Sequence, residues 1–412
     1  MNKTILLTAL ILCSAFSTSL FSQENRPKIK VGGQFYLATY YDSYKSVDIR
    51  EGVTYSFPLP PNLDPGGEDL NKASQLGISV YQTRLNFTAS DFRLLNAEGK
   101  VYVETDFLGS GNDFLQMLRL RQAYLELKWS RDELLLGQTN NLEFPVEVIS
   151  GLLTAAAGSP LTVLSRAATI RYGRRLGEQW KAFAAMTYHR IQASSSTVPT
   201  TLSANRNSGL PTFEGRIQYG STDRVFFGIA GAYKTMRPRL ETDNGYRASS
   251  TIGSGSVTAF LRWNLNGHTF KMQGTYGGNM THLGMIGGYG KRADDAGDDY
   301  GYTNLRTGSL WGDFETRPYR NLRAGIFAGY MENMGSEDAI DPAVIYARSG
   351  NLHHTGRVSP RLTWMKDNLL VGLEYSLFWA EWGKAFDDYH VPVESFDTTH
   401  NNRVLLLVRY TF

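Results

Sequence analysis

The last twelve residues of the chain, 401–412, read N-N-R-V-L-L-L-V-R-Y-T-F and decide the fold. Side chains of an extended strand alternate between its two faces. One face of this stretch carries Val404, Leu406, Val408, Tyr410 and Phe412, and the other carries Arg403, Arg409 and Thr411. A final strand with an apolar stripe and a terminal aromatic residue is typical of a transmembrane β-barrel, whose last strand pairs with its first and leaves no unpaired edge in lipid. The edge strand of a soluble sheet is the alternative interpretation.

Composition favours the barrel. The chain has 412 residues, of which 12% are aromatic, and 23 Tyr and 21 Phe suit the aromatic girdles of such a barrel. The mean hydropathy is -0.30, and after the N-terminus no stretch is long and apolar enough for a transmembrane helix. The net charge of +3 is too small to indicate attraction to nucleic acid.

The N-terminus predicts export. Lys3 precedes an apolar run, residues 5–16, and small and polar residues follow up to Ser22. This order is that of a secretory signal peptide. We therefore expect a signal peptide over residues 1–22, a single barrel domain over residues 23–412, and a location in the bacterial outer membrane. Cys13 lies in the signal, so the mature chain is expected to have no disulfide and no cysteine metal site. We expect no cofactor.

The connections between strand-like runs alternate between tight and long. Tight joints are expected near residues 130–132, 176–178, 221–223, 264–267, 317–321 and 366–368, and long polar stretches at 44–73, 140–165, 192–210, 236–252, 279–302, 333–352 and 384–400. Short periplasmic turns and long extracellular loops are the topology of bacterial outer-membrane barrels. The sequence thus predicts an all-β, antiparallel barrel of about sixteen strands around a wet lumen.

The face expected to line the lumen carries about twice as many basic as acidic residues, and its bases include Arg121, Arg171, Arg216 and Arg262. Such charges bias a pore toward anions, and guanidinium groups bind carboxylate or phosphate bidentately. The alternative is that each arginine pairs with a neighbouring acid or with lipopolysaccharide phosphate at the rim.

The third long loop, residues 140–165, is less polar than a surface loop. We expect it to fold into the barrel, with Glu143 and Glu147 facing the channel. Arg166, Arg171 and Arg174 follow at once on the next strand, and acids on the loop opposite bases on the wall would produce a transverse field. The alternative is a loop that packs outward at a subunit contact.

Two neighbouring runs carry a family resemblance. Residues 118–126, L-R-L-R-Q-A-Y-L-E, and residues 134–139, L-L-L-G-Q-T, resemble the hairpin of DcaP-type porins, which are distantly similar to phosphate-selective porins. The detailed similarity covers residues 118–175. It implies a trimeric channel of sixteen strands for small anionic solutes such as dicarboxylates, with Arg119, Arg121 and Gln138 near the constriction and residues 140–165 as the inward loop.

One departure accompanies the resemblance. No stretch suited to the family's periplasmic coiled coil precedes the first expected strand, which leaves a homotrimer open. The polar residues between positions 118 and 129 change phase, and this change predicts a β-bulge.

The chain end resembles the signal read by the barrel-assembly machinery, so Phe412 is the expected contact. Outer-membrane lipid and lipopolysaccharide are the other expected partners.

Other motifs give only weak evidence for a metal site or for catalysis. Asp294, Asp295, Asp298 and Asp299 could gather calcium, but a solvated acidic loop fits better because the EF-hand spacing is absent. His353 and His354 are expected to be a rim pair. No catalytic motif is found, so we expect a porin rather than an enzyme. An adhesin that presents its loops, or a barrel-borne hydrolase with convergent Ser, His and acid residues, remains an alternative.

Overall fold

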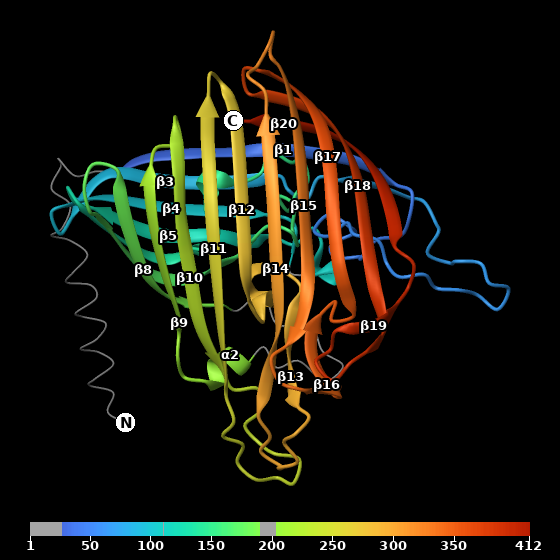
Figure 1. Ribbon diagram of the computed structural model, residues 1–412. Coiled ribbons are helices and arrows are strands. Elements are labelled where there is room, and N and C mark those ends of the chain that lie inside the picture. Colours follow the sequence, from blue (N-terminus) through green and yellow to red (C-terminus); the bar gives the residue numbers. More distant parts are fainter. Residues whose placement is uncertain (1–26, 110, 190–202) are drawn as a thin grey trace, which may run out of the picture.

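The computed structural model describes residues 27–109, 111–189 and 203–412, and the expected signal peptide lies outside these residues. The chain forms a closed antiparallel barrel of sixteen strands, as the sequence predicts (Figure 1). β1 (Lys28–Asp42) pairs with β20 (Thr399–Thr411) and closes the ring. At the chain end, the amide of Gly33 donates to the carbonyl of Phe412 at 3.0 Å, and the amide of Phe412 donates to Gly33 at 3.1 Å.

One position of the ring is an interrupted strand. β2 (Gln75–Ser79) and β3 (Arg84–Leu94) both pair with β1, and the chain turns inward between them. The other ring members, in chain order, are β4 (Ala97–Asp106), β5 (Arg119–Lys128), β6 (Asp132–Asn140), β7 (Arg166–Arg175), β8 (Trp180–Tyr188), β9 (Thr212–Gly220), β10 (Val225–Met236), β11 (Ile252–Leu265), β12 (His268–Gly278), β14 (Tyr302–Glu315), β15 (Leu322–Ser336), β17 (Leu352–Lys366) and β18 (Leu369–Phe386).

The remaining elements are short. β13 (Gly287–Arg292), β16 (Ile340–Arg348) and β19 (Pro392–Ser395) lie at the long-loop end of the barrel (Figure 1). The helical turns are η2 (Asn112–Phe114), η3 (Val146–Val148), α2 (Ala204–Asn207) and η4 (Met280–Leu283). Among the described residues, no helix has the length and apolar character needed to cross a membrane.

The alternation expected for β20 is present. The side chains of Val404 and Leu406 are 45% and 46% exposed on the outer face, whereas Arg403, Leu405 and Leu407 on the inner face are 2%, 3% and 2% exposed. The outer face is therefore an apolar surface suited to lipid.

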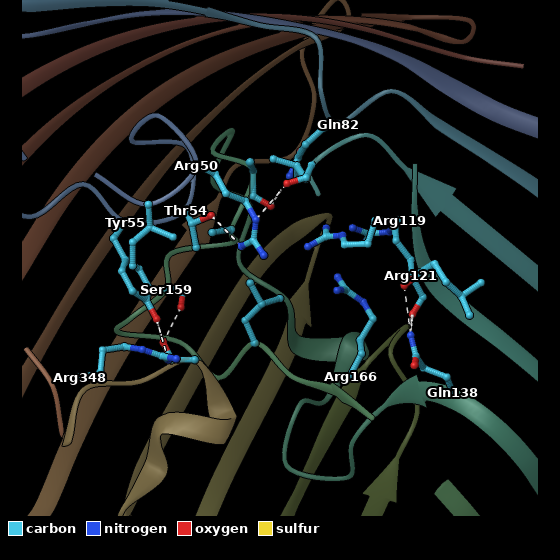
Figure 2. A pocket seen from close by; sticks show the side chains of 17 residues that line it. Arg50, Thr54, Tyr55, Gln82, Arg119, Arg121, Gln138, Ser159, Arg166 and Arg348 are labelled. Atoms are coloured by element: carbon cyan, nitrogen blue, oxygen red, sulfur yellow. Dashed lines mark hydrogen bonds between the residues drawn. The ribbon is translucent and has the colours of Figure 1, made fainter. Parts of the chain in front are cut away.

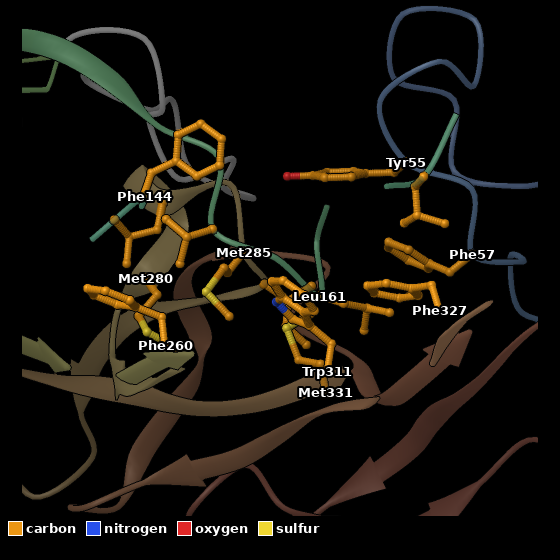
Figure 3. Close-up of a cluster of buried hydrophobic side chains, with 14 of the residues drawn as sticks. Tyr55, Phe57, Phe144, Leu161, Phe260, Met280, Met285, Trp311, Phe327 and Met331 are labelled. Atoms are coloured by element: carbon orange, nitrogen blue, oxygen red, sulfur yellow. The ribbon is translucent and has the colours of Figure 1, made fainter. Parts of the chain in front are cut away.

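Part of the lumen is a hydrophobic core, which differs from the wet lumen expected from the sequence. Apolar side chains of three inward-folded segments pack on aromatic residues of the inner wall (Figure 3). Tyr55 and Phe57 come from the first long loop, Phe144 from the third and Met285 from the segment after η4, and the wall contributes Phe226, Phe260, Trp311 and Phe327. Burial of these side chains fixes the loops inside the barrel.

A charge on the outer face should destabilise the barrel. Leu406→Lys, near the middle of β20, is expected to lower the free energy of unfolding by about 2–4 kcal/mol in lipid vesicles, because the ammonium group would face hydrocarbon. Guanidinium unfolding in vesicles measures this. Arg409→Lys, on the inner face, is the control and should unfold like the unmodified chain. Equal stability of the two variants would contradict the assignment of the faces.

Candidate functional site

The third loop, residues 141–165, folds into the lumen as predicted. Phe144, Val148 and Leu152 lie in the lumen core, and the amides of Leu142 and Leu153 donate to wall carboxylates, those of Glu214 and Glu374, both at 2.8 Å. The loop is therefore held both by apolar packing and by hydrogen bonds to buried acids of the wall.

Glu143 does not face the channel, and that expectation was wrong. Its side chain is 0% exposed and accepts a hydrogen bond from Ser256 at 2.9 Å and a longer one from Thr258. Burial, with a smaller contribution from the nearby Glu214, raises the pKa of Glu143 to about 8. Its carboxyl therefore anchors the loop against β11 instead of supplying a charge to the pore.

Glu147 and the wall arginines are in direct contact. The Arg216 guanidinium lies 2.9 Å from the Glu147 carboxylate, and Arg262 donates to the Glu147 carbonyl at 3.1 Å. Arg216 also lies 4.7 Å above the Phe260 ring. Because this acid and base neutralise each other side by side, they do not form the expected field across an open passage.

A cavity of about 170 Å³ opens between the first loop, the third loop and β5, and five arginines line it. They are Arg50, Arg119, Arg121, Arg166 and Arg348. Figure 2 shows Arg50, Arg119 and Arg166 pointing toward one another across this space. Three of the predicted constriction residues, Arg119, Arg121 and Arg166, thus come together, and Gln138 lies beside them.

Two carboxylates of β4 are bound to the arginines of β5. Asp106 accepts two hydrogen bonds from Arg119, at 2.9 and 2.7 Å, and one from Arg121 at 2.8 Å. Glu104 lies 2.6 Å from Arg121. The expected β-bulge is present, since Glu104 pairs with Gln122 and Thr105 with Leu120, which makes Arg121 the extra residue of β5. The bulge directs Arg121 into the lumen.

Two further arginines of the cavity donate to backbone carbonyl oxygens. Arg50 donates to the Leu108 carbonyl at 3.1 Å, and Arg348 donates to the Thr281 carbonyl at 2.9 Å. Within the described part of the chain, the buried Nε of Arg166 has no hydrogen-bond partner. The described side chains that line the cavity include five arginines and no carboxylate.

Sequence reasoning missed Arg50 and Arg348. Both lie in stretches that it assigned to external loops, residues 44–73 and 333–352. The apolar pair Tyr55 and Phe57 beside Arg50 was the available sign that the first loop turns inward, because such side chains favour burial.

Arg171 and Arg174 lie away from the cavity. Arg171 is on the inner face of β7 and donates to the Asn140 carbonyl. Arg174 is exposed, next to Asp132 at 3.4 Å, near the short-turn end. Its placement on the solute path was wrong, because Ala167, Thr169, Arg171 and Gly173 take the inner face of β7 and leave residue 174 on the outer face.

On other strands of the inner wall, several lumen arginines are paired with acids. The pairs join Arg357 to Glu374 at 2.5 Å, Arg361 to Asp313 at 2.8 Å and Arg403 to Asp42 at 2.6 Å. Buried ion pairs of this kind present little net charge to a solute. These pairs therefore contribute little of the net positive charge expected along the whole wall.

A second cavity, of about 520 Å³, lies on the other side of the third loop. Its lining includes Arg84, Arg323 and Arg409. Gln82 and Ala155 line both cavities, and the Gln82 amide donates to the Ala155 carbonyl at 2.6 Å. Gln82 reaches this position because the chain turns inward between β2 and β3.

The four aspartates considered for calcium bind groups of the long loops instead. Asp294 pairs with Arg292 at 3.1 Å, Asp295 accepts from the amides of Gly297 and Gly301, and Asp299 accepts from Ser249. The hydrogen bond from Ser249 lowers the pKa of Asp299 to about 2. Their carboxylates face separate partners and do not converge on one point.

A Ser, His and acid set does converge, at Ser165, His189 and Glu214. The serine hydroxyl lies 3.5 Å from His189 Nδ1, and Glu214 lies 3.4 Å from His189 Nε2. All three side chains are at most 5% exposed, so a substrate carbonyl cannot reach the hydroxyl. The set joins the end of the third loop to the wall.

No protein-family model matches the sequence, and no curated protein matches it. Solved structures do match. The outer membrane channel DcaP of Acinetobacter baumannii aligns over 95% of this chain and 99% of its own, with a TM-score of 0.69 and 15% identity. The chain has the fold of the DcaP channel.

Other porins share this fold at lower similarity. The anion-selective porin from Comamonas acidovorans aligns over 94% of this chain and 100% of its own, with a TM-score of 0.53 and 8% identity. OmpF of Salmonella typhi, in a complex with daunomycin, aligns over 95% and 99%, with a TM-score of 0.54 and 12% identity. The DcaP-like resemblance of residues 118–175 is thus confirmed as a likeness of fold.

The buried carboxyl of Glu143 should make the stability of the DcaP-like barrel depend on pH. A carboxyl whose pKa is raised on folding stabilises the fold while protonated and destabilises it as the pH rises through that pKa. Glu143→Gln should therefore match the unmodified chain at about pH 5 and exceed it by a few kcal/mol at about pH 9. Chemical unfolding at the two pH values measures this.

Glu147→Gln is the matched control on the same loop. It removes the ion pair with Arg216 and should lower stability at the higher pH. A Glu143→Gln variant with no gain at the higher pH would show that this carboxyl is not buried as described.

Proposed function

We propose that the protein is an outer-membrane porin that passes small anionic solutes by passive diffusion. The arginine-lined cavity inside the barrel carries this proposal, since its described lining has five arginines and no carboxylate. A surplus of fixed positive charge in a low-dielectric passage raises the local concentration of anions. Passive diffusion requires no chemical reaction of the side chains.

The outer surface and the comparisons support the membrane location. The exposed apolar face of the strands fits a lipid environment. The DcaP structure is described as an outer membrane channel, and the Comamonas acidovorans protein as an anion-selective porin. We propose that this chain, too, is an outer-membrane channel and is selective for anions.

We propose that the solute path runs from the arginine-lined cavity, past Gln82 and Ala155, into the second cavity. Arg84 on the far side continues the positive lining. The solutes best suited are carboxylates and phosphate-like anions, because a guanidinium group can bind two of their oxygens at once. Passage requires that each contact be weak enough to release the solute.

The expected partners also belong to the proposal. Outer-membrane lipid and lipopolysaccharide would surround the barrel, and the barrel-assembly machinery would read Phe412. A homotrimer is proposed as well, since a trimer form is described for the porin-fold protein OmpT of Vibrio cholerae, which has a TM-score of 0.54 to this chain.

Charge reversal in the cavity should change ion selectivity. Arg166→Glu is expected to shift selectivity in planar bilayers toward cations, because it removes an arginine without an acidic partner from the path. Arg174→Glu is the matched control, because the same charge change then lies on the outer face of the same strand. An equal shift for both variants, or none for Arg166→Glu, would contradict the proposed path.

Shortening Gln82 should widen the passage. Gln82→Ala removes the contact with Ala155 that separates the two cavities, so single-channel conductance is expected to rise, by roughly twofold if this contact limits flow. Gln138→Ala, at the edge of the first cavity, is the control and should change conductance less. Unchanged conductance for Gln82→Ala would place the narrowest point elsewhere.

A further inference from the structure

Two histidines and two glutamates meet at the long-loop end of three neighbouring strands. His353 and His354 lie at the start of β17, Glu332 near the end of β15 and Glu381 near the end of β18. His353 Nδ1 lies 3.1 Å and His354 Nε2 lies 3.2 Å from the two carboxylate oxygens of Glu381. The Glu332 carboxylate lies 3.8 Å from His353 Nε2. None of these four residues lines the arginine-lined cavity.

A β-bulge brings the two histidines to one carboxylate. Leu352 pairs with Trp382 and His354 with Glu381, so β17 has one residue more than β18 at this point, namely His353. In a regular strand, consecutive side chains point to opposite faces. The bulge directs both imidazoles to the same side, while His354 also stands directly opposite Glu332 of β15.

The group lies on the outer face of the barrel, near the end that carries the long loops, and is partly exposed. Met331 and Ala380, which precede the two glutamates, are 0% exposed and belong to the lumen core. Because side chains alternate, Glu332 and Glu381 point outward. The exposed fractions of the four side chains lie between 19% and 37%, so an ion can reach them without opening the fold.

We propose that His353, His354 and Glu381 form a binding site for a divalent transition-metal ion, with Glu332 as a further ligand. Imidazole and carboxylate together suit Zn²⁺, whereas Mg²⁺ and Ca²⁺ prefer oxygen ligands alone. One ligand atom from each of His353, His354 and Glu381 lies within 4.8 Å of the others. Bonds of about 2.0–2.2 Å to a central ion require these atoms to move somewhat closer, which partly exposed side chains can do by small rotations.

The bound ion would connect β15, β17 and β18 at the end of the barrel that carries the long loops. β15 and β17 already make an aromatic contact there, with the Tyr330 ring 5.5 Å from the His354 ring. Ligands from neighbouring strands restrain the rim, so metal binding should stabilise the folded barrel, and this stabilisation should grow with the logarithm of the ion concentration once that concentration exceeds the dissociation constant.

Isothermal titration of purified, tag-free protein in detergent with zinc chloride tests the site. We expect one ion per chain with micromolar or tighter affinity, and no binding of Mg²⁺ under the same conditions. The double variant H353N/H354N should weaken zinc binding by about 100-fold or more, since it removes both imidazoles. His268→Asn, at the first residue of β12, is the matched control and should bind as the unmodified chain does.

Folding of each variant is checked by heat-modifiable migration on a gel, and Glu381→Gln provides a second test that keeps both imidazoles. Electron paramagnetic resonance with Cu²⁺ as the probe should show nitrogen couplings that the double variant lacks. Zinc binding of equal strength in the folded double variant, or no zinc binding to the unmodified chain, would overturn the proposal.

Discussion

The structure depends on one constraint, which is that every backbone N–H and C=O inside a lipid bilayer needs a hydrogen-bond partner within the protein. The barrel satisfies it when β20 pairs with β1, including the reciprocal hydrogen bonds between Gly33 and Phe412. Once the ring is closed, strand stability no longer requires a particular chemistry on the inner face. The outer face must remain apolar, whereas the lumen is free to hold charges, loops and hydrophobic packing. Function is therefore determined by the inner face and by the segments that fold into it.

Those segments divide the lumen into two unlike regions. Apolar side chains of three inward segments pack on the wall around Phe260 and Phe327, and this packing, together with hydrogen bonds to wall carboxylates, positions the third loop. Of the cavities that remain, the one against β5 is lined by arginines from distant parts of the chain. Bringing these like charges together is unfavourable by itself, and Asp106, Glu104 and backbone carbonyl oxygens offset part of the repulsion. An anion in the cavity would offset it further, so the proposed anion passage depends on the packing that positions the loops.

Much of this architecture could be predicted from the sequence, because it follows from local patterns. The alternation in the last strand, the tight and long connections, and the phase change that became the bulge at Arg121 all reflect the period-two geometry of strands. The inward third loop was predicted from its apolar composition. The errors at Glu143 and Arg174 have different causes. The Glu143 carboxyl binds hydroxyl groups of a strand that is distant in the sequence. The Arg174 side chain lies on the outer face because its position in the alternation of β7 differs by one residue from the inward-facing positions. Arg348 could not be predicted, because its place depends on long-range folding of loops, which no local pattern encodes.

The most direct test of the account is the zero-current potential of the purified, unmodified protein in a planar bilayer with a potassium chloride gradient. If surplus arginine charge governs the passage, chloride carries most of the current. The potential then takes the sign of the chloride equilibrium potential and weakens as salt screens the charges. A potential with the sign of potassium, or the absence of any conductance, would contradict the account.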